Sequence, residues 1–105
     1  MNRMVHHVWC VSKRMTFFYV YILQSKLTPS WIYVGYTENL KKRFIEHNNG
    51  YTPSTKRFQP FDLIHYEAYR NSKDAKRREL YLKTTKGKTT LRTMLKDYLL
   101  VRSRS

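Results

Sequence analysis

The sequence predicts a small α+β domain with three short strands and about three helices. Aromatic and β-branched residues gather in three short runs, residues 17–23, 31–37 and 63–69, as is typical of strands. Elsewhere, apolar residues recur at intervals of three and four, which is the helical period. The chain has 105 residues, which suits a single domain with a modest core.

The first two runs are predicted to form a β-hairpin. Residues 17–23 are apolar on both faces, as expected of a central strand, and a Thr-Pro-Ser sequence at 28–30 provides a turn signal. Gly35, inside the second run, indicates a close backbone approach or a bulge. A turn in this loop would place Tyr21 and Tyr33 roughly opposite each other on one face of the hairpin.

The helices are predicted from capping signals and apolar spacing. Thr37 is the expected N-cap of the first helix, and Gly50 its C-terminal stop. The second helix is expected to begin at an N-cap, Ser72, to run to about residue 85 and to stop at Gly87. Apolar residues within 91–99 follow the helical period and predict a third helix.

We expect three parts along the chain: a leader (residues 1–15), a folded domain (residues 16–101) and a frayed tail (residues 102–105). The leader carries no acidic residue and shows no clear period, so we expect it to be disordered or loosely attached. Met15 stands immediately before the first strand, which allows an upstream start codon to account for the leader.

The cysteine and hydropathy patterns bear on the cellular compartment. Cys10 is the single cysteine, so no internal disulfide can form, which fits a reducing cytoplasm. No apolar run approaches the roughly 18 residues of a membrane span, and no signal peptide is evident. We therefore expect a cytoplasmic protein. His6, His7 and Cys10 could in principle hold a metal ion, but adjacent histidines suit one tetrahedral site poorly.

The charge balance is strongly basic. Lys and Arg number 21 against 7 Asp and Glu, giving a net charge of +14. This surplus favours a polyanionic partner, most often nucleic acid, because each neutralised phosphate releases a counterion. A ribosomal-type or merely soluble basic protein remains an alternative, whereas an anionic membrane surface fits less well. The cations expected to contact nucleic acid are Lys41, Lys42, Lys56, Arg57, Lys83 and Lys86.

Four side chains of the hairpin and the first helix could carry chemistry. A phenol such as Tyr21 or Tyr33 can act as a general base, or orient a water, if nearby cations lower its pKa from about 10. Arg43 could supply that charge, and its planar fork also suits a phosphate. His47, four residues further on, shares its helical face and could shuttle a proton or hold a phosphate. Simple packing, a solvated basic face and a capping histidine are the competing interpretations.

Glu79 stands out among the acidic residues because its helical face also carries Ala75 and Leu82. A carboxylate that points inward could bind one Mg²⁺, with waters and a substrate phosphate completing the shell. The alternative is a salt bridge to Lys83 at i+4, and the residues alone favour this alternative.

In their order and spacing, these residues resemble the GIY-YIG nuclease domain. The likeness rests on five pieces, which are Tyr19-Val20-Tyr21, Tyr33-Val34-Gly35, residues 39–43, Glu46-His47-Asn48, and Ala75 with Arg78-Glu79. It runs from about residue 17 to residue 99 and is to small single-domain bacterial members, which are similar to the N-terminal nuclease domain of the DNA-repair excinuclease. Tyr19 replaces the first glycine of the name motif, and Tyr36 stands where excinuclease-like members often carry lysine.

The resemblance implies a three-stranded antiparallel sheet flanked by helices and a DNA endonuclease that uses one Mg²⁺ or Mn²⁺. By this likeness, Tyr33 would be the general base that activates water, with Tyr21 in support. Arg43 would steady the scissile phosphate, Glu79 would hold the metal, and His47 would lie near the phosphate. Two alternatives stay open: a non-catalytic nucleic-acid-binding module, and a nuclease that needs a protein partner to be active.

Overall fold

The computed structural model describes residues 16–104; the predicted leader, with His6, His7 and Cys10, lies outside them. The elements follow in the order β1 (Phe18–Ser25), β2 (Ile32–Thr37), α2 (Leu40–Asn48), a single 3₁₀ turn η2 (Lys56–Phe58), β3 (Phe61–Tyr69), α3 (Ser72–Leu82), α4 (Thr85–Met94) and α5 (Lys96–Arg104). Within this part of the chain, no helix is both long enough and apolar enough to cross a membrane.

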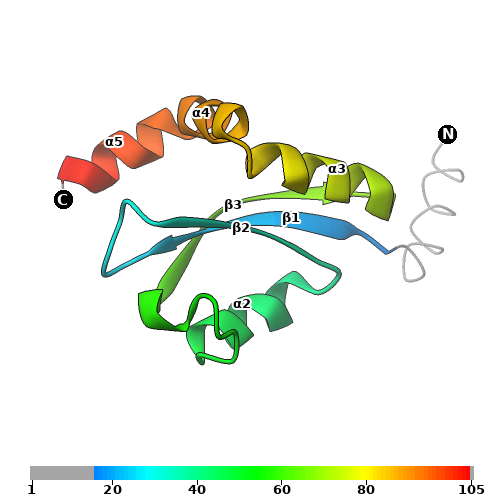
Figure 1. The fold of residues 1–105 in the computed structure, drawn as a ribbon, viewed down its shortest axis with the longest axis horizontal. Coiled ribbons are helices and arrows are strands. Elements are labelled where there is room, and N and C mark those ends of the chain that lie inside the picture. The colour runs from blue at the N-terminus through cyan, green and yellow to red at the C-terminus, as the bar shows by residue number, and fades with distance from the viewer. Residues whose placement is uncertain (1–15, 105) are drawn as a thin grey trace, which may run out of the picture.

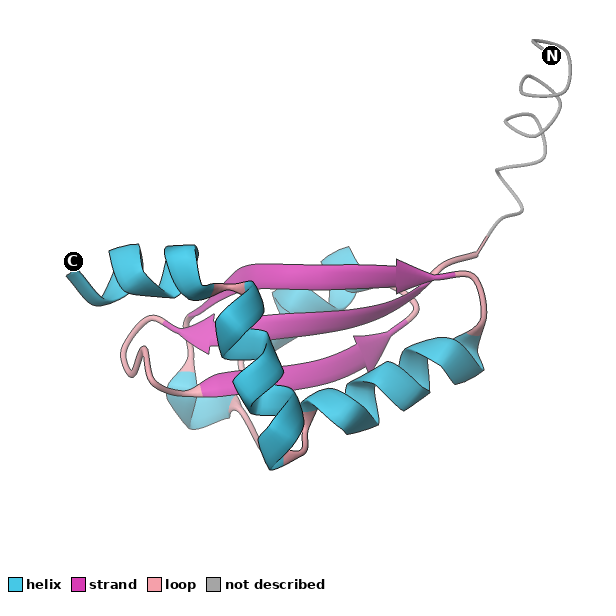
Figure 2. Ribbon diagram, turned by 90° about the horizontal axis from the view of Figure 1, so that it is seen from above, coloured by secondary structure: helices cyan, strands magenta, loops and turns pink. Residues whose placement is uncertain are grey.

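The three strands form one antiparallel sheet in the order β2-β1-β3, which confirms the predicted α+β fold. As its apolar sequence predicted, β1 is the central strand, and its residues 20–25 are all buried. Helix α2 covers one face of the sheet, and the layer formed by α3, α4 and α5 lies on the other (Figure 1). Figure 2 shows the strands side by side behind this second layer.

Alternation along β1 divides the core into two layers. Val20 and Ile22 face α3 and α4, where they pack with Leu82 and Leu91. The residues between them point to the α2 side, where Tyr21 and Leu23 form a second buried cluster with Phe61. The sheet therefore separates an aliphatic layer from an aromatic one.

Asparagines, rather than the predicted threonine and serine, cap α2 and α3. The side chain of Asn39 accepts a hydrogen bond from the Lys42 amide at 3.1 Å. That of Asn71, one residue earlier than predicted, accepts from the Lys73 amide at 2.9 Å. The hydroxyl of Thr37, the predicted cap, accepts instead from the Asn39 amide on the approach to α2. Both prediction errors have one cause, since asparagine caps a helix as well as serine or threonine.

Glycines have different roles at the ends of α2 and α3. Gly50 follows α2 with φ +74°, which confirms the predicted stop. The predicted stop at Gly87 was wrong, because Gly87 is buried inside α4. A Cβ there would collide with the backbone carbonyl of Tyr81, so the glycine permits α4 to pass close to the end of α3. Thr84 starts α4 by accepting a hydrogen bond from the Gly87 amide at 3.0 Å.

The C-terminal segment differs from prediction in two ways. The single helix expected over residues 91–99 is divided at Leu95, where φ −109° and ψ 19° leave the helical range. No glycine or proline marks this break in the sequence. Helix α5 then continues through Arg104, so residues 102–104 are helical rather than a frayed tail.

Candidate active site

The predicted catalytic tyrosines lie on the face of the sheet that α2 covers. The register pairs Tyr21 with Gly35, and Leu23 with Tyr33. Tyr21 and Tyr33 are therefore diagonal neighbours on one face rather than directly opposite, with ring centroids 6.2 Å apart. Their shared face was predicted correctly, but their register was shifted by two residues.

The phenol of Tyr21 lies directly against Gly35 of the edge strand. A Cβ added at Gly35 would collide with the ring carbons and the hydroxyl oxygen of Tyr21. This is the close approach that the sequence predicted. Because Gly35 has no side chain, the Tyr21 ring crosses β2, and its hydroxyl comes near the free edge of the sheet.

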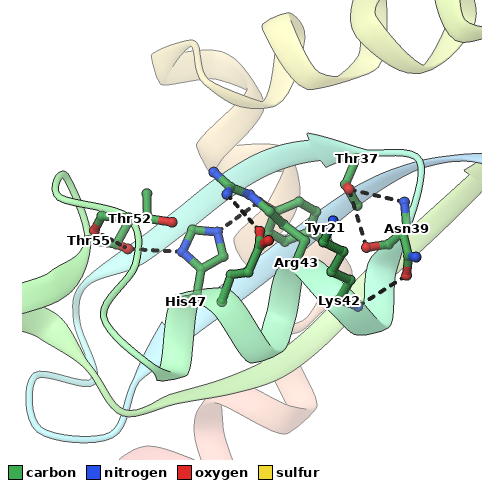
Figure 3. Close-up of polar contacts among 9 residues, drawn as sticks. Tyr21, Thr37, Asn39, Lys42, Arg43, His47, Thr52 and Thr55 are labelled. Carbon is green, nitrogen blue, oxygen red and sulfur yellow. Dashed lines mark hydrogen bonds and ion pairs between the residues drawn. The ribbon is translucent and has the colours of Figure 1, made fainter.

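The Tyr21 hydroxyl begins a buried chain of hydrogen bonds (Figure 3). Its oxygen lies 2.8 Å from Nε2 of His47, and Nδ1 of His47 lies 2.9 Å from Oγ1 of Thr55. The Thr55 hydroxyl donates in turn to the Thr52 carbonyl at 3.4 Å. Because that carbonyl can only accept, Thr55 accepts from Nδ1–H of His47, and Tyr21 donates to Nε2. All three linked side chains are buried.

Arg43 connects this buried chain to solvent. Its guanidinium hydrogen-bonds to the Tyr21 phenol, and it pairs with Glu46 at 3.1 Å. The Arg43 side chain is 33% exposed, and it lines an open groove of about 290 Å³ with Tyr36 and Lys42. Arg43 is thus fixed by partners on the protein side and accessible on the other, as a phosphate-binding arginine requires.

Burial, not the nearby cation, controls the charge of these groups. Burial raises the pKa of Tyr21 to about 12; the hydrogen bond from Arg43 opposes this only in part, and Tyr33 and Glu79 add to the rise. Burial also lowers the pKa of His47 to about 4, and the positive charge of Arg43 lowers it further. The expectation that Arg43 would bring the Tyr21 pKa below its usual value was therefore wrong.

Glu79 lies on α3, in the layer on the other face of the sheet. Its carboxylate is 3.0 Å from Nζ of Lys83, so the predicted salt bridge is present, and its side chain is only 17% exposed. Its negative charge nevertheless contributes to raising the pKa of both Tyr21 and Tyr36. The Glu79 carboxylate is therefore within electrostatic reach of the phenol that crosses β2.

Glu79 fits a metal ion only as a single protein carboxylate. Within residues 16–104, no group of three or more His, Cys, Asp and Glu side chains could hold a metal by itself. One partly buried carboxylate is the donor set of a Mg²⁺-type ion that takes its other ligands from water and substrate phosphate. It does not fit an ion such as structural zinc, which needs a closed protein cage.

The six cations predicted to contact nucleic acid do not form one cluster. Lys42 lines the groove of Arg43, and Lys83 pairs with Glu79, so these two adjoin the predicted catalytic residues. Lys41 lies on another side of α2, where it lines a second groove. The remaining three are Lys56 and Arg57 in η2, and Lys86 in the first turn of α4.

Two residues of this site were missed from the sequence. Thr55, in a segment that was interpreted only as a loop, fixes the orientation of His47. Glu46 holds the outer side of Arg43. A threonine in a polar loop carries no sequence signal of such a contact, whereas the i+3 spacing of Glu46 from Arg43 could have indicated the ion pair.

Comparison with known proteins gives matches over most of the chain. The family described as GIY-YIG catalytic domain matches residues 17–92. A UPF0213 protein of Clostridium perfringens is 41% identical over 66 residues, 62% of this chain and 69% of that protein. One from Pediococcus acidilactici is 35% identical over 88 residues, 80% of this chain and 87% of that protein. The solution NMR structure of a UPF0213 protein from Bacillus halodurans is 30% identical, covers 74% of this chain and 84% of its own, and has a TM-score of 0.47.

Proposed function

We propose, on the premise that the chain belongs to the GIY-YIG nuclease family, that it is a divalent-metal-dependent endonuclease acting on DNA. The observation that carries the proposal is the arrangement around β2. A solvent-accessible arginine and two tyrosines lie on one side of this strand, and the charge of Glu79 reaches the phenol from the other. The net charge of +14 supports a nucleic-acid substrate.

Arg43 is proposed to bind the scissile phosphate. Its guanidinium donates in parallel to two oxygens and stabilises the negative charge that grows as the phosphorus becomes five-coordinate. Glu46 occupies part of this fork now, and a phosphate would compete with it as a second anion.

The two tyrosines are proposed to have separate roles. Tyr21 commits its proton to His47 and accepts a hydrogen bond from Arg43, so it positions the guanidinium and is a poor base. Tyr33 would be the general base: as a phenolate, it takes a proton from water while the water oxygen bonds to phosphorus. The bond to the leaving oxygen breaks, and that oxygen takes a proton from solvent. His47 acts through Tyr21, because both its ring nitrogens are already engaged.

Glu79 is proposed to hold the divalent ion, Mg²⁺ or Mn²⁺. When bound, such an ion neutralises charge on the phosphoryl group and its leaving oxygen. To accept it, Glu79 must release Lys83, whose side chain is 47% exposed and can turn toward solvent or a neighbouring phosphate.

Nicking of supercoiled plasmid, with Mg²⁺ or Mn²⁺ against EDTA, tests the proposal. Glu79→Gln should abolish metal-dependent nicking but retain salt-sensitive DNA binding. Asp74→Asn removes an exposed carboxylate from the same helix and should nick like the parent. Tyr33→Phe should lose most of the activity, whereas Tyr51→Phe, which changes an exposed tyrosine, should not.

Three other outcomes would count against parts of the proposal. Nicking that survives Glu79→Gln would place the activity elsewhere or in a contaminant. Nicking lost equally in Asp74→Asn would point to a general effect on α3. Tight DNA binding without nicking by the parent would favour the binding module or the partner-dependent nuclease.

A further inference from the structure

A second groove lies on the α2 side of the sheet, next to β3. It is an open hollow of about 560 Å³, within the roughly 300–1,000 Å³ range of small-molecule sites. We call it the Tyr66 groove and define it by six of its lining residues, which are Tyr19, Leu40, Lys41, Phe44, Leu63 and Tyr66. Neither the proposed hydrolysis nor the core requires this hollow.

The Tyr66 groove presents an aromatic ring on a rigid support. Tyr66 is 53% exposed, although its backbone pairs with buried Tyr21 in the centre of the sheet. The edge of one ring packs on the other in the Tyr19–Tyr66 pair, with centroids 6.1 Å apart and planes at 62°. This contact restricts the Tyr66 ring while half of it stays open to solvent. A held, exposed ring is a suitable platform for stacking a flat ligand.

The groove combines an apolar floor with a cation. Leu40, Phe44 and Leu63 supply the apolar surface, and Lys41 supplies the charge. Lys41 lies in the first turn of α2, which contains no acidic residue. A cation is unfavourable there because it faces the positive end of the helix dipole. The stability of α2 therefore gives no reason for Lys41, whereas an anionic ligand does.

The Tyr66 groove continues into the groove of Arg43. Glu38 and Asn39, at the start of α2, line both hollows. Lys41 lies on the first groove and Lys42 on the second, so a cation flanks each side of this junction. An extended polyanion could thus pass around the start of α2 from one groove to the other.

We propose that the Tyr66 groove binds an unpaired nucleobase of the DNA strand whose phosphate lies at Arg43. The base stacks on Tyr66, and Lys41 faces the adjoining phosphate. A base paired in a duplex cannot present its face to a protein ring, so the substrate has an unstacked or single-stranded nucleotide near the cut. The link to the cut rests on the proposed function, but base binding in the groove does not.

Metal-free binding tests the groove separately from hydrolysis. Fluorescence anisotropy in EDTA would compare a labelled oligo(dT) with a blunt hairpin duplex that carries the same number of phosphates. Tyr66→Ala should weaken oligo(dT) binding about 10-fold or more, the usual loss of one stacked base. Duplex affinity and the salt dependence of binding should change little, because no charge is removed. Tyr66→Phe should bind like the parent.

Two controls make the test specific. Tyr51→Ala removes another exposed tyrosine and should leave oligo(dT) binding unchanged. An oligonucleotide with abasic sugars in place of bases should bind the parent as weakly as oligo(dT) binds Tyr66→Ala. If Tyr66→Ala does not fold by circular dichroism, Tyr66→Leu replaces it.

Several results would overturn the inference. They are an equal loss of duplex and oligo(dT) affinity in Tyr66→Ala, abasic binding as tight as oligo(dT) binding, and a parent dimer that Tyr66→Ala dissociates in sedimentation. The last result would make the groove an interface between copies. Base-dependent binding without metal-dependent nicking would retain the groove and reject the proposed nuclease.

Discussion

The hydroxyl oxygen of Tyr21 lies 2.8 Å from Nε2 of His47, between β1 and α2. Burial raises the pKa of the phenol to about 12 and lowers the pKa of the imidazole to about 4. The proton therefore stays on Tyr21 at neutral pH. The pair provides a hydrogen bond of fixed direction, which turns the acceptor side of the Tyr21 oxygen toward Arg43.

Thr55 should control the tautomer of His47. Thr55→Val removes the acceptor for Nδ1–H and leaves a buried donor unpaired, at a cost of about 1–3 kcal/mol. The variant should show a lower midpoint in urea, slower nicking and a loss of the Nδ1–H tautomer in ¹⁵N NMR spectra. Thr55→Ser, which keeps the hydroxyl, should restore the tautomer and the rate. An unchanged His47 tautomer in Thr55→Val would contradict the direction assigned to this chain.

His47 should make the fold sensitive to mild acid. Its pKa is about 4 in the folded protein and about 6.5 when exposed, so the unfolded chain takes up the proton first. Stability should therefore fall as the pH drops from about 6.5 toward 4, by on the order of 2 kcal/mol. Urea unfolding of the parent and of His47→Gln, followed between pH 7 and 5, measures this. The same slope in both proteins would show that another group is responsible.

Glu67 should act at lower pH. Burial alone would raise its pKa, but hydrogen bonds from Arg78, Tyr69 and His65 lower the pKa of Glu67 to about 2. Arg78 makes two of these, at 3.0 and 3.2 Å, and so ties α3 to β3. The stabilisation is complete above about pH 4.5 and should disappear as the pH falls toward 2, by on the order of 2 kcal/mol.

Glu67→Gln provides the measurement for this pair. The variant should be less stable than the parent at pH 7, and the difference should shrink as the pH is lowered from 4.5 to 3. Thermal unfolding monitored by circular dichroism would show both effects. A stability difference that stays constant across this range would mean that ionisation of Glu67 does not contribute.

Gly35 should be required for the position of Tyr21. The Cβ of Gly35→Ala would overlap the Tyr21 ring, which costs about 1–3 kcal/mol when the core must shift. Nicking should fall with it, because Arg43 loses its partner. In a Tyr21→Leu background the same Gly35→Ala change should cost little, since the ring is gone. A double-mutant cycle of urea unfolding free energies gives this coupling, and additive effects would exclude it.

The sequence was sufficient for the elements and for the faces of the strands. Alternation along β1 placed Tyr21 and Tyr33 on one face, and the apolar run identified β1 as central. Gly35 was correctly interpreted as a close approach. Each of these features depends on residues near one another in the chain, where periodicity and propensity are informative.

The remaining features depend on balances between distant residues. The pKa of Tyr21 results from burial against Arg43, and the composition of the strand does not show which effect is larger. Thr55 contacts His47 only because a polar loop folds back onto α2. Gly87 was misinterpreted because a glycine that stops a helix and one that permits a close crossing look the same in sequence.

This crossing has a consequence for mutational scans. At Gly87, the atoms nearest to an added Cβ belong to the backbone of Tyr81 and Leu82, which cannot rotate away as a side chain can. Every other amino acid would therefore push α4 off the end of the helix that carries Glu79. A library of random variants should record position 87 as intolerant as the reacting residues, although it touches no substrate. Intolerance to replacement in this protein will mark joints as well as chemistry.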